Sequence, residues 1–157
     1  MTWNTCDLSD EHGDAARHIS SLRHFGGRSR FTGPIETVQC SEDNSRVKEL
    51  ANTPGHGRVM LVDGGGSLRC ALVGDTIAGE AIANGWVGIV VRGGIRDIAA
   101  LATMPIGVLA LGTHPRKSAR VGQGLAGVPI EIDGERFAPG DVLYADEDGI
   151  VVLAASS

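Results

Sequence analysis

Lysine is scarce in this sequence, and the balance of charge is negative. Only two of the 157 residues are lysines, Lys48 and Lys117, and the formal net charge is −5 at pH 7. Proteins that bind nucleic acid directly use clustered Lys and Arg side chains to neutralise phosphates and release counterions. The composition therefore argues against direct binding of nucleic acid.

Long apolar runs are also missing. No stretch approaches the ~20 consecutive apolar residues that a membrane-spanning helix needs. Residues 1–5 (MTWNT) lack the basic and apolar regions of a signal peptide. We therefore expect a cytoplasmic protein that makes no contact with a membrane.

The cysteines and histidines form no recognisable disulfide or metal pattern. Cys6, Cys40 and Cys70 are odd in number and include no close pair, which fits neither a disulfide framework nor a structural zinc site. The histidines lack the spacing of two ligands on one helix. We expect reduced thiols and nominate none of these side chains for chemistry.

The chain does contain enough apolar residues for one core, together with many glycines. Apolar residues make up 42% of the sequence, which suits one domain over residues 1–157. The 23 glycines are spread along the chain. They predict tight turns and close backbone contacts within a folded domain, and not a linker.

Strands and helices are predicted to alternate through the middle of the chain. Short helical signals over residues 5–24 and a turn at 25–29 precede a first strand over residues 35–40. The elements predicted next are a helix ending at Leu50, a strand over 58–63, a helix over 75–84, a strand over 87–91, a turn at 93–94, a helix over 97–103 and a strand over 106–111.

The last third of the chain changes character. Residues 128–132, a turn at 133–135 and strands that begin near Val142 and Ile150 form a pattern typical of β-hairpins. The sequence thus predicts a single α/β domain with a central βαβαβ unit and a β-rich C-terminal third.

Residues with the chemistry of an oxo-acid site follow the predicted strands. In open α/β sheets, ligands bind beyond the carboxyl ends of the strands, where the glycines at 64–66 and 93–94 are predicted to lie. Arg96 and Asp97 come shortly after the second glycine pair. An arginine can hold a carboxylate through two hydrogen bonds, and an aspartate is a ligand for hard cations.

The predicted helix that begins at Asp75 adds an end that attracts anions. Gly74, Asp75, Thr76 and Ile77 supply backbone N–H groups at its positive terminus, and a carboxylate such as Asp75 can orient water or move a proton. These features also fit an ordinary helix cap at Asp75 and a solvated Arg96–Asp97 pair. Spacing by itself leaves both interpretations open.

Several motifs resemble one family across nearly the whole chain. They are residues 25–29 (FGGRS), 40–44 (CSEDN), 62–67 (VDGGGS) and 140–146 (GDVLYAD). With these motifs, the sequence is similar to the family of the regulator of ribonuclease activity A (RraA) and the metal-dependent 4-hydroxy-4-methyl-2-oxoglutarate aldolases. Asp75, followed after 20 residues by Arg96 and Asp97, matches the signature of the members that are aldolases and oxaloacetate decarboxylases.

The resemblance implies a swivelling β/β/α-type fold, assembled as a homotrimer or a dimer of trimers with sites at subunit boundaries. It implies that Asp97 holds Mg²⁺ or Mn²⁺, partly through waters, and that Arg96 binds the carboxylate and the developing enolate of a pyruvyl group. Asp75 orients a water that relays protons. The N–H groups of Gly74, Asp75, Thr76 and Ile77 complete the cradle.

One departure from the family pattern concerns a further acid. Active relatives often carry an acid a few residues after the Arg–Asp pair, whereas residues 98–102 (IAALA) supply none. An acid of residues 146–148 (DED) from a neighbouring subunit is one way to fill the gap. Solvated acids in a turn are the other interpretation of that segment.

The implied reaction is cleavage of 4-hydroxy-4-methyl-2-oxoglutarate to pyruvate, with decarboxylation of oxaloacetate, both through a metal-bound pyruvate enolate. The residues favour a metal over an imine, because an imine aldolase needs a buried lysine with a lowered pKa. Neither Lys48 nor Lys117 is predicted to lie near the glycine turns. Metal and arginine must then stabilise the enolate.

The alternative is a non-enzymatic regulator that binds ribonuclease E or its helicase partner, as the founding members of the family are described. The acidic composition permits such binding, but a pure binding protein has no physical need for Asp75, Arg96 and Asp97 together. A third interpretation is an S-adenosylmethionine methyltransferase with a glycine loop at 64–66. The short chain and its hairpin-rich C-terminus argue against it.

Overall fold

A parallel sheet that is buried on both faces forms the centre of the protein. The computed structural model describes residues 2–155, and its large sheet has the strand order β1-β12-β11-β3-β4-β6-β7-β2. The neighbouring parallel strands are β3 (Phe31–Gln39), β4 (Val59–Asp63), β6 (Gly88–Ile95) and β7 (Gly107–Thr113). The α/β fold predicted from the sequence is confirmed.

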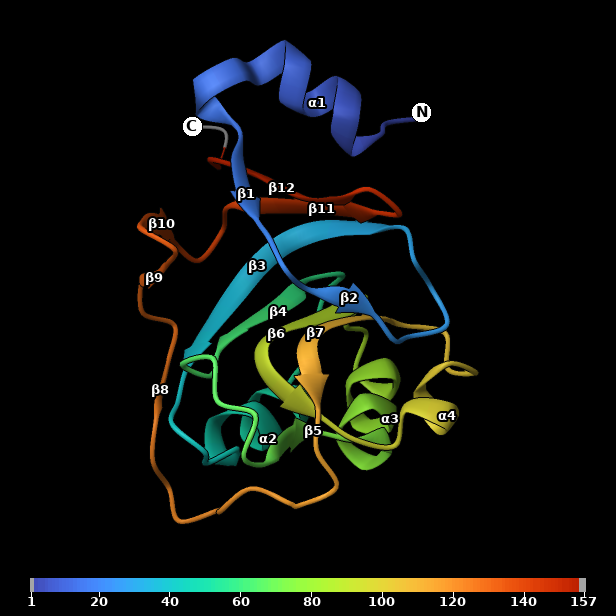
Figure 1. Ribbon diagram of the computed structural model, residues 1–157, viewed down its shortest axis with the longest axis vertical. Coiled ribbons are helices and arrows are strands. Elements are labelled where there is room, and N and C mark those ends of the chain that lie inside the picture. Colours follow the sequence, from blue (N-terminus) through green and yellow to red (C-terminus); the bar gives the residue numbers. More distant parts are fainter. Residues whose placement is uncertain (1, 156–157) are drawn as a thin grey trace.

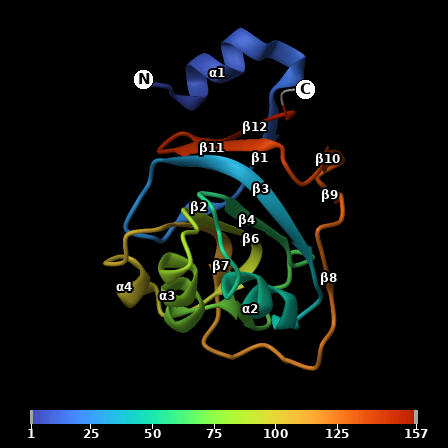
Figure 2. The ribbon, with the colours of Figure 1, turned by 180° about the vertical axis from the view of Figure 1, so that it is seen from behind.

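Short helices cover one face of this parallel sheet (Figures 1 and 2). They are α2 (Ser45–Ala51), α3 (Asp75–Ala83) and α4 (Ile98–Leu101). A short strand that the sequence did not reveal, β5 (Ala71–Val73), pairs with β6 and leads directly into α3. Apolar side chains of the helices, such as Ile77 and Leu101, meet the sheet in one buried core.

Beyond β3 the large sheet continues as antiparallel strands, whose side chains pack against the other face of the parallel strands. They are β11 (Val142–Asp146), β12 (Gly149–Leu153) and β1 (Arg17–Ile19), beside the hairpin of β9 (Ile130–Ile132) and β10 (Glu135–Phe137). The edge pairings are β2 (Arg23–His24) with β7 and β8 (Leu125–Ala126) with β3. Helix α1 (Thr5–His12), which leads into the 3₁₀ turn η1 (Gly13–Ala15), packs against the outer side of β11 and β12. Two β layers and one α layer result (Figure 1).

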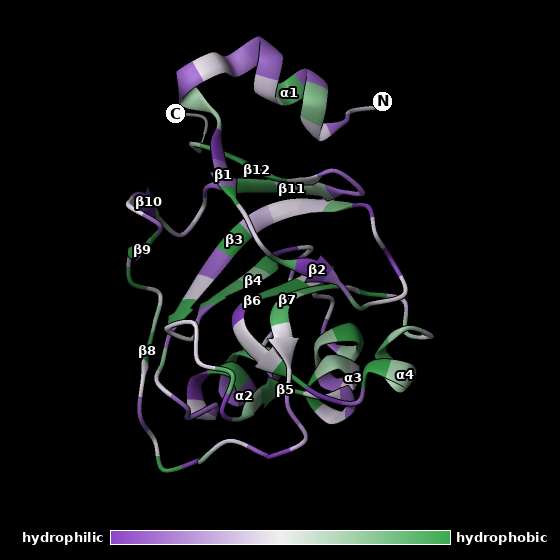
Figure 3. Ribbon diagram, viewed as in Figure 1, coloured by the Kyte–Doolittle hydropathy of each residue, from purple (hydrophilic) through white to green (hydrophobic). Residues whose placement is uncertain are grey.

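The apolar run of β4 explains why two cores exist. Met60 and Val62 pack into the core that faces the helices, whereas Val59 and Leu61 pack into the core that faces the antiparallel strands. Successive side chains of a strand point to opposite faces, so the part of β4 between the two cores, residues 59–62, is apolar on both faces and only the final Asp63 is polar. Figure 3 shows this hydrophobic colouring along β4.

Two sequence predictions were wrong in detail. Residues 17–19 and 23–24 are strands and not helical, because they pair with β12 and β7, partners that lie far away in the sequence. The glycines at 93–94 do not form a turn but lie inside β6, where the register with β7 shifts. A Cβ at Gly94 would lie 2.4 Å from the carbonyl oxygen of Cys70, so glycine allows β5 to approach β6 closely.

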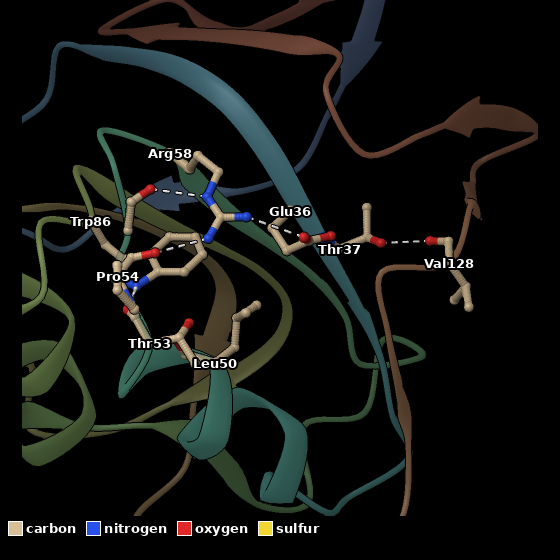
Figure 4. Close-up of polar contacts among 9 residues, drawn as sticks. Glu36, Thr37, Leu50, Thr53, Pro54, Arg58, Trp86 and Val128 are labelled. Carbon is tan, nitrogen blue, oxygen red and sulfur yellow. Dashed lines mark hydrogen bonds and ion pairs between the residues drawn. The ribbon is translucent and has the colours of Figure 1, made fainter.

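The amino-terminal end of the parallel strands is closed by side chains. Arg58 precedes β4, stacks over the ring of Trp86 at 4.7 Å, and donates hydrogen bonds to Glu36 and to the Pro54 carbonyl (Figure 4). The indole N–H of Trp86 donates to the Thr53 carbonyl. Side chains thus fill this end of the sheet, whereas a cavity lies at the opposite, carboxyl end.

A long connection runs past that carboxyl end. Residues 115–124, called the strap below, lead from β7 toward β8 without regular secondary structure (Figures 1 and 2). All three cysteines are free, with Cys40 and Cys70 buried and Cys6 exposed. Within residues 2–155, no helix has the length and apolar character needed to cross a membrane.

Candidate active site at the carboxyl end of the sheet

A cavity of about 470 Å³ opens at the carboxyl ends of β5 and β6. Its walls come from the start of α3, the Arg96–Asp97 pair after β6, helix α2 and the strap. Its lining includes Asn44, Lys48, Gly74, Asp75, Thr76, Ile77, Arg96, Asp97, Lys117, Ser118 and Arg120. The structure therefore brings every site residue nominated from the sequence to one cavity.

Asp97 and the start of α3 are joined directly. The Oδ2 atom of Asp97 accepts a hydrogen bond from the Asp75 N–H at 3.0 Å, so the carboxylate caps the positive end of the helix. Asp97 reaches this position with a left-handed backbone, φ +62°. Gly74 lies between them, and a Cβ at Gly74 would lie 2.5 Å from that same oxygen.

The first turn of α3 still offers hydrogen-bond donors. Its first regular bond at this end runs from the Ala78 N–H to the Gly74 carbonyl. Within the described part of the chain, the N–H groups of Thr76 and Ile77 have no backbone acceptor. The Ile77 side chain is buried in the core below. These two N–H groups can bind a carboxylate of a ligand.

Arg96 is held at its backbone while its side chain borders the cavity. The Arg96 N–H donates to the Val73 carbonyl at 3.0 Å, which fixes the residue to the end of β5. One guanidinium nitrogen, Nη1, donates to the Pro115 carbonyl at 3.2 Å. A guanidinium has five N–H donors, so Arg96 has donors beyond this bond for an anionic ligand.

The cavity is cationic although the whole chain is acidic. Four lining residues are cationic, namely Lys48, Arg96, Lys117 and Arg120, and only two are acidic. Neither lysine was predicted to lie near the glycine turns at 64–66 and 93–94, and those glycines do not line the cavity, but both lysines do because α2 and the strap border it. Such an excess of positive charge favours an anionic ligand.

Neither lysine is the amine that an imine mechanism requires. The Lys48 Nζ atom contacts both carboxylate oxygens of Glu80 at 2.7 Å. Burial alone raises the pKa of Glu80, but the hydrogen bonds from Lys48 and Asn52 outweigh it and lower that pKa. Lys117 is exposed. An imine-forming lysine is instead buried and lacks a charge partner.

The donor atoms at the site fit a hydrated divalent cation. Within residues 2–155, no group of three or more His, Cys, Asp or Glu side chains is arranged to enclose a metal ion. Mg²⁺ keeps several waters and is commonly bound through one or two carboxylates. Asp97 and Asp75 are exposed carboxylates at one cavity, which is the donor chemistry that such an ion needs.

In the acidic turn at 146–148, Asp146 differs from Glu147 and Asp148, which are both exposed. Asp146 is only 2% exposed, and its two oxygens accept hydrogen bonds from the N–H and Oγ of Thr5. Glu147 accepts a hydrogen bond from Ser29. The Asp146 side chain therefore anchors α1, and it is not a free acid for another site.

Sequence reasoning missed the residues that α2 and the strap contribute. Asn44 lies within the CSEDN motif, and Lys48 follows it by one helical turn, so both face the same side of α2. That spacing was a usable signal. Lys117, Ser118 and Arg120 gave none, because an irregular segment has no periodicity from which its direction can be predicted.

Comparison with curated proteins finds close relatives over almost the full length. A protein from Xanthomonas campestris pv. campestris (strain B100), provisionally named 4-hydroxy-4-methyl-2-oxoglutarate aldolase, is 54% identical over 99% of this chain and 93% of its own length. A protein from Laribacter hongkongensis with the same provisional name is 52% identical over 96% of each chain.

Solved structures and a family model agree on one fold. The structure described as the RNA-processing inhibitor RraA from Thermus thermophilis superimposes with a TM-score of 0.95 at 42% identity, covering 100% of this chain and 96% of that one. A Geobacillus kaustophilus structure, described as an S-adenosylmethionine:2-dimethylmenaquinone methyltransferase, gives 0.94 at 42% identity, with 98% and 96% covered. The family model described as RraA-like, Aldolase/RraA, matches residues 5–152. This chain belongs to the RraA-like family.

Proposed function

We propose that this protein is a divalent-metal-dependent lyase that cleaves 4-hydroxy-4-methyl-2-oxoglutarate to pyruvate and decarboxylates oxaloacetate. The observation that carries the proposal is the convergence of Arg96, Asp97 and the free N–H groups of α3 on one cationic cavity. The provisional names of the relatives point to the same chemistry.

Both reactions require the same charge to be stabilised. When the bond between C3 and C4 breaks, its electron pair moves toward the 2-oxo group and produces the enolate of pyruvate, with either a second pyruvate or CO₂ as the other product. Arg96 binds the C1 carboxylate and offsets the negative charge that develops on the enolate oxygen. The N–H groups of Thr76 and Ile77 orient the substrate carboxylate.

Proton transfer falls to Asp75. In the aldol cleavage, the C4 hydroxyl loses a proton as the bond breaks, and C3 of the enolate later gains one. Asp75 is exposed at the mouth of the cavity, where its carboxylate can orient a water that carries these protons. Decarboxylation needs only the second of the two transfers.

Asp97, with Asp75 nearby, would hold Mg²⁺ or Mn²⁺ largely through waters, and the ion would supply a Lewis acid to the 2-oxo group. We expect protein stripped with EDTA to lose oxaloacetate decarboxylation and to regain it with either ion, measured as pyruvate release. Borohydride treatment with substrate serves as the control. Full activity in chelator, or substrate trapped on Lys48 or Lys117, would contradict this mechanism.

We further propose a homotrimer or a dimer of trimers. The family resemblance carries this proposal, and two large apolar side chains, Leu68 and Ile98, are each 43% exposed and available for contact with another subunit. Light scattering at micromolar concentration should give a mass of three or six chains of 16.3 kDa. A stable monomer would refute the assembly.

A regulator that binds ribonuclease E or its helicase partner is the second candidate. It is favoured by the high similarity to the Thermus protein, which is described as an RNA-processing inhibitor. A methyltransferase is not favoured, because the sheet ends in antiparallel strands on both sides of its parallel centre. A seven-stranded methyltransferase domain instead continues the alternation of strands and helices.

A further inference from the structure

The strap forms one wall of the cavity, but apolar burial does little to hold it. Lys117, Ser118 and Arg120 of the strap line the cavity. Val121 is the only large apolar side chain of the strap and is 74% exposed. Since the strap also lacks regular secondary structure, its position depends on polar contacts.

Several residues hold the strap, including Ala71 and Arg46 through its carbonyls, and Asp43 is the buried carboxylate among them. It is 1% exposed, and its Oδ2 atom accepts a hydrogen bond from the Val121 N–H at 2.8 Å, while Oδ1 accepts one from the Ser45 N–H at 2.8 Å. The hydroxyl of Ser45 in turn accepts a hydrogen bond from the Gly122 N–H at 2.8 Å. The start of α2 thereby binds two successive strap N–H groups.

Residues next to Asp43 make further hydrogen bonds to the part of the strap that lines the cavity. The Ala119 N–H donates to the Glu42 carbonyl at 3.0 Å, and the Asn44 N–H donates to the Ala119 carbonyl at 3.1 Å. The side chain of Asn44 accepts a hydrogen bond from Arg120 Nε and donates to the Leu72 carbonyl. The CSEDN motif thus connects the strap to β5.

The carboxylate form of Asp43 is the form that fits. Burial alone raises the pKa of Asp43, but the hydrogen bonds from Ser45, Val121 and Gln123 outweigh it and lower that pKa to about 2. Both oxygens accept from N–H groups. An asparagine would turn an NH₂ group toward one of those donors, which leaves a buried donor unpaired.

We infer that Asp43 is a positioning residue, which holds the strap so that Lys117, Ser118 and Arg120 form one wall of the substrate cavity. Asp43 itself does not line that cavity, so it acts through the strap and does not touch substrate. The expected effect on substrate binding rests on the proposed lyase function. The claim that Asp43 holds the strap does not.

The variant Asp43→Asn tests both parts. The strap contains three sites for trypsin, after Arg116, Lys117 and Arg120, and cleavage there in the native protein reports release of the strap. Loss of one charge-assisted hydrogen bond should speed cleavage by about tenfold. In the metal-loaded enzyme, KM for oxaloacetate should also rise by about tenfold, while kcat changes by less than about threefold.

Asp146→Asn is the matched control. Asp146 is equally buried and also accepts backbone N–H bonds, but it holds α1 and not the strap. It should leave strap cleavage and KM at wild-type values. Ser45→Ala removes the bond to Gly122 and the hydrogen bond of the Ser45 hydroxyl to Asp43, but it keeps the bond from Asp43 to Val121. It should give a smaller effect in the same direction, and it carries the test if Asp43→Asn does not fold.

Unchanged strap cleavage in Asp43→Asn and Ser45→Ala overturns the inference, whatever the enzyme assay gives. The trypsin assay needs no lyase substrate, so its result does not depend on the proposed function. Equal changes in Asp146→Asn also overturn it, since they would reflect general destabilisation. Faster cleavage with unchanged KM refutes the link to the substrate cavity. Absence of turnover by the wild type counts instead against the proposed function.

Discussion

In the Arg96→Lys variant, we expect kcat/KM for oxaloacetate and for 4-hydroxy-4-methyl-2-oxoglutarate to fall by about 100-fold or more. Lysine keeps the positive charge but cannot hold a carboxylate at two oxygens and an enolate oxygen with one planar group. Arg96 is positioned by a backbone bond to β5, which the substitution preserves. Steady-state pyruvate release measures the effect.

Arg92→Lys provides the matched control for this variant. Arg92 lies on β6, four residues before Arg96, and is absent from the cavity lining, so its conservative replacement should leave the rate near that of the wild type. Denaturant unfolding of both variants separates chemistry from misfolding. A wild-type rate in Arg96→Lys would refute the role assigned to Arg96.

The same experiment separates the enzyme from the regulator. Binding to a ribonuclease should hardly change in Arg96→Lys, because the charge is kept and Arg96 is half-buried at the cavity. If neither protein turns over a 2-oxo acid with metal present, the regulator should replace the lyase as the proposed function.

Gly74→Ala should also lower kcat/KM by about 100-fold, because small displacements of a catalytic group have effects of this size. The added Cβ would lie 2.5 Å from Asp97 Oδ2, so the Asp97 carboxylate must move away from the start of α3. The Gly74 backbone, with φ −137°, is open to any L-residue. We therefore expect a folded protein with a displaced Asp97.

Gly79→Ala is the control on the same helix. A Cβ at Gly79 would meet only Met104 Cε, at 3.8 Å, and alanine is more favourable than glycine inside a helix by about 1 kcal/mol. This variant should match or exceed the wild type in thermal stability and keep its activity. Equal activity loss in both variants would show that α3 itself, and not the space beside Asp97, is what matters.

The sequence by itself determined the elements whose signals are local. The apolar run of β4 and the helix at Asp75 carry their own periodicity and end signals, and the structure has both where they were predicted. Gly74, Asp75, Arg96 and Asp97 were also nominated from the sequence. Residues at the ends of neighbouring parallel strands must lie together once the strands pair.

Only the tertiary structure decided what depends on distant partners. Strands β1 and β2 have three and two residues, too few for any periodicity, and they exist because β12 and β7 offer them hydrogen bonds. The local sequence at 93–94 is typical of a turn. These glycines nevertheless lie in a strand, because β5 pairs with β6 and contacts Gly94.

The cationic wall of the cavity is another feature that only the tertiary structure decided. Lys48 and Lys117 are 69 positions apart in the sequence, and nothing local indicates that they face one cavity. Their meeting depends on where the irregular strap runs, and that path is held by bonds from Ala71 to Arg116 and from Asp43 and Ser45 to Val121 and Gly122. Such contacts are set by the folded arrangement, because each partner alone would be satisfied equally well by water.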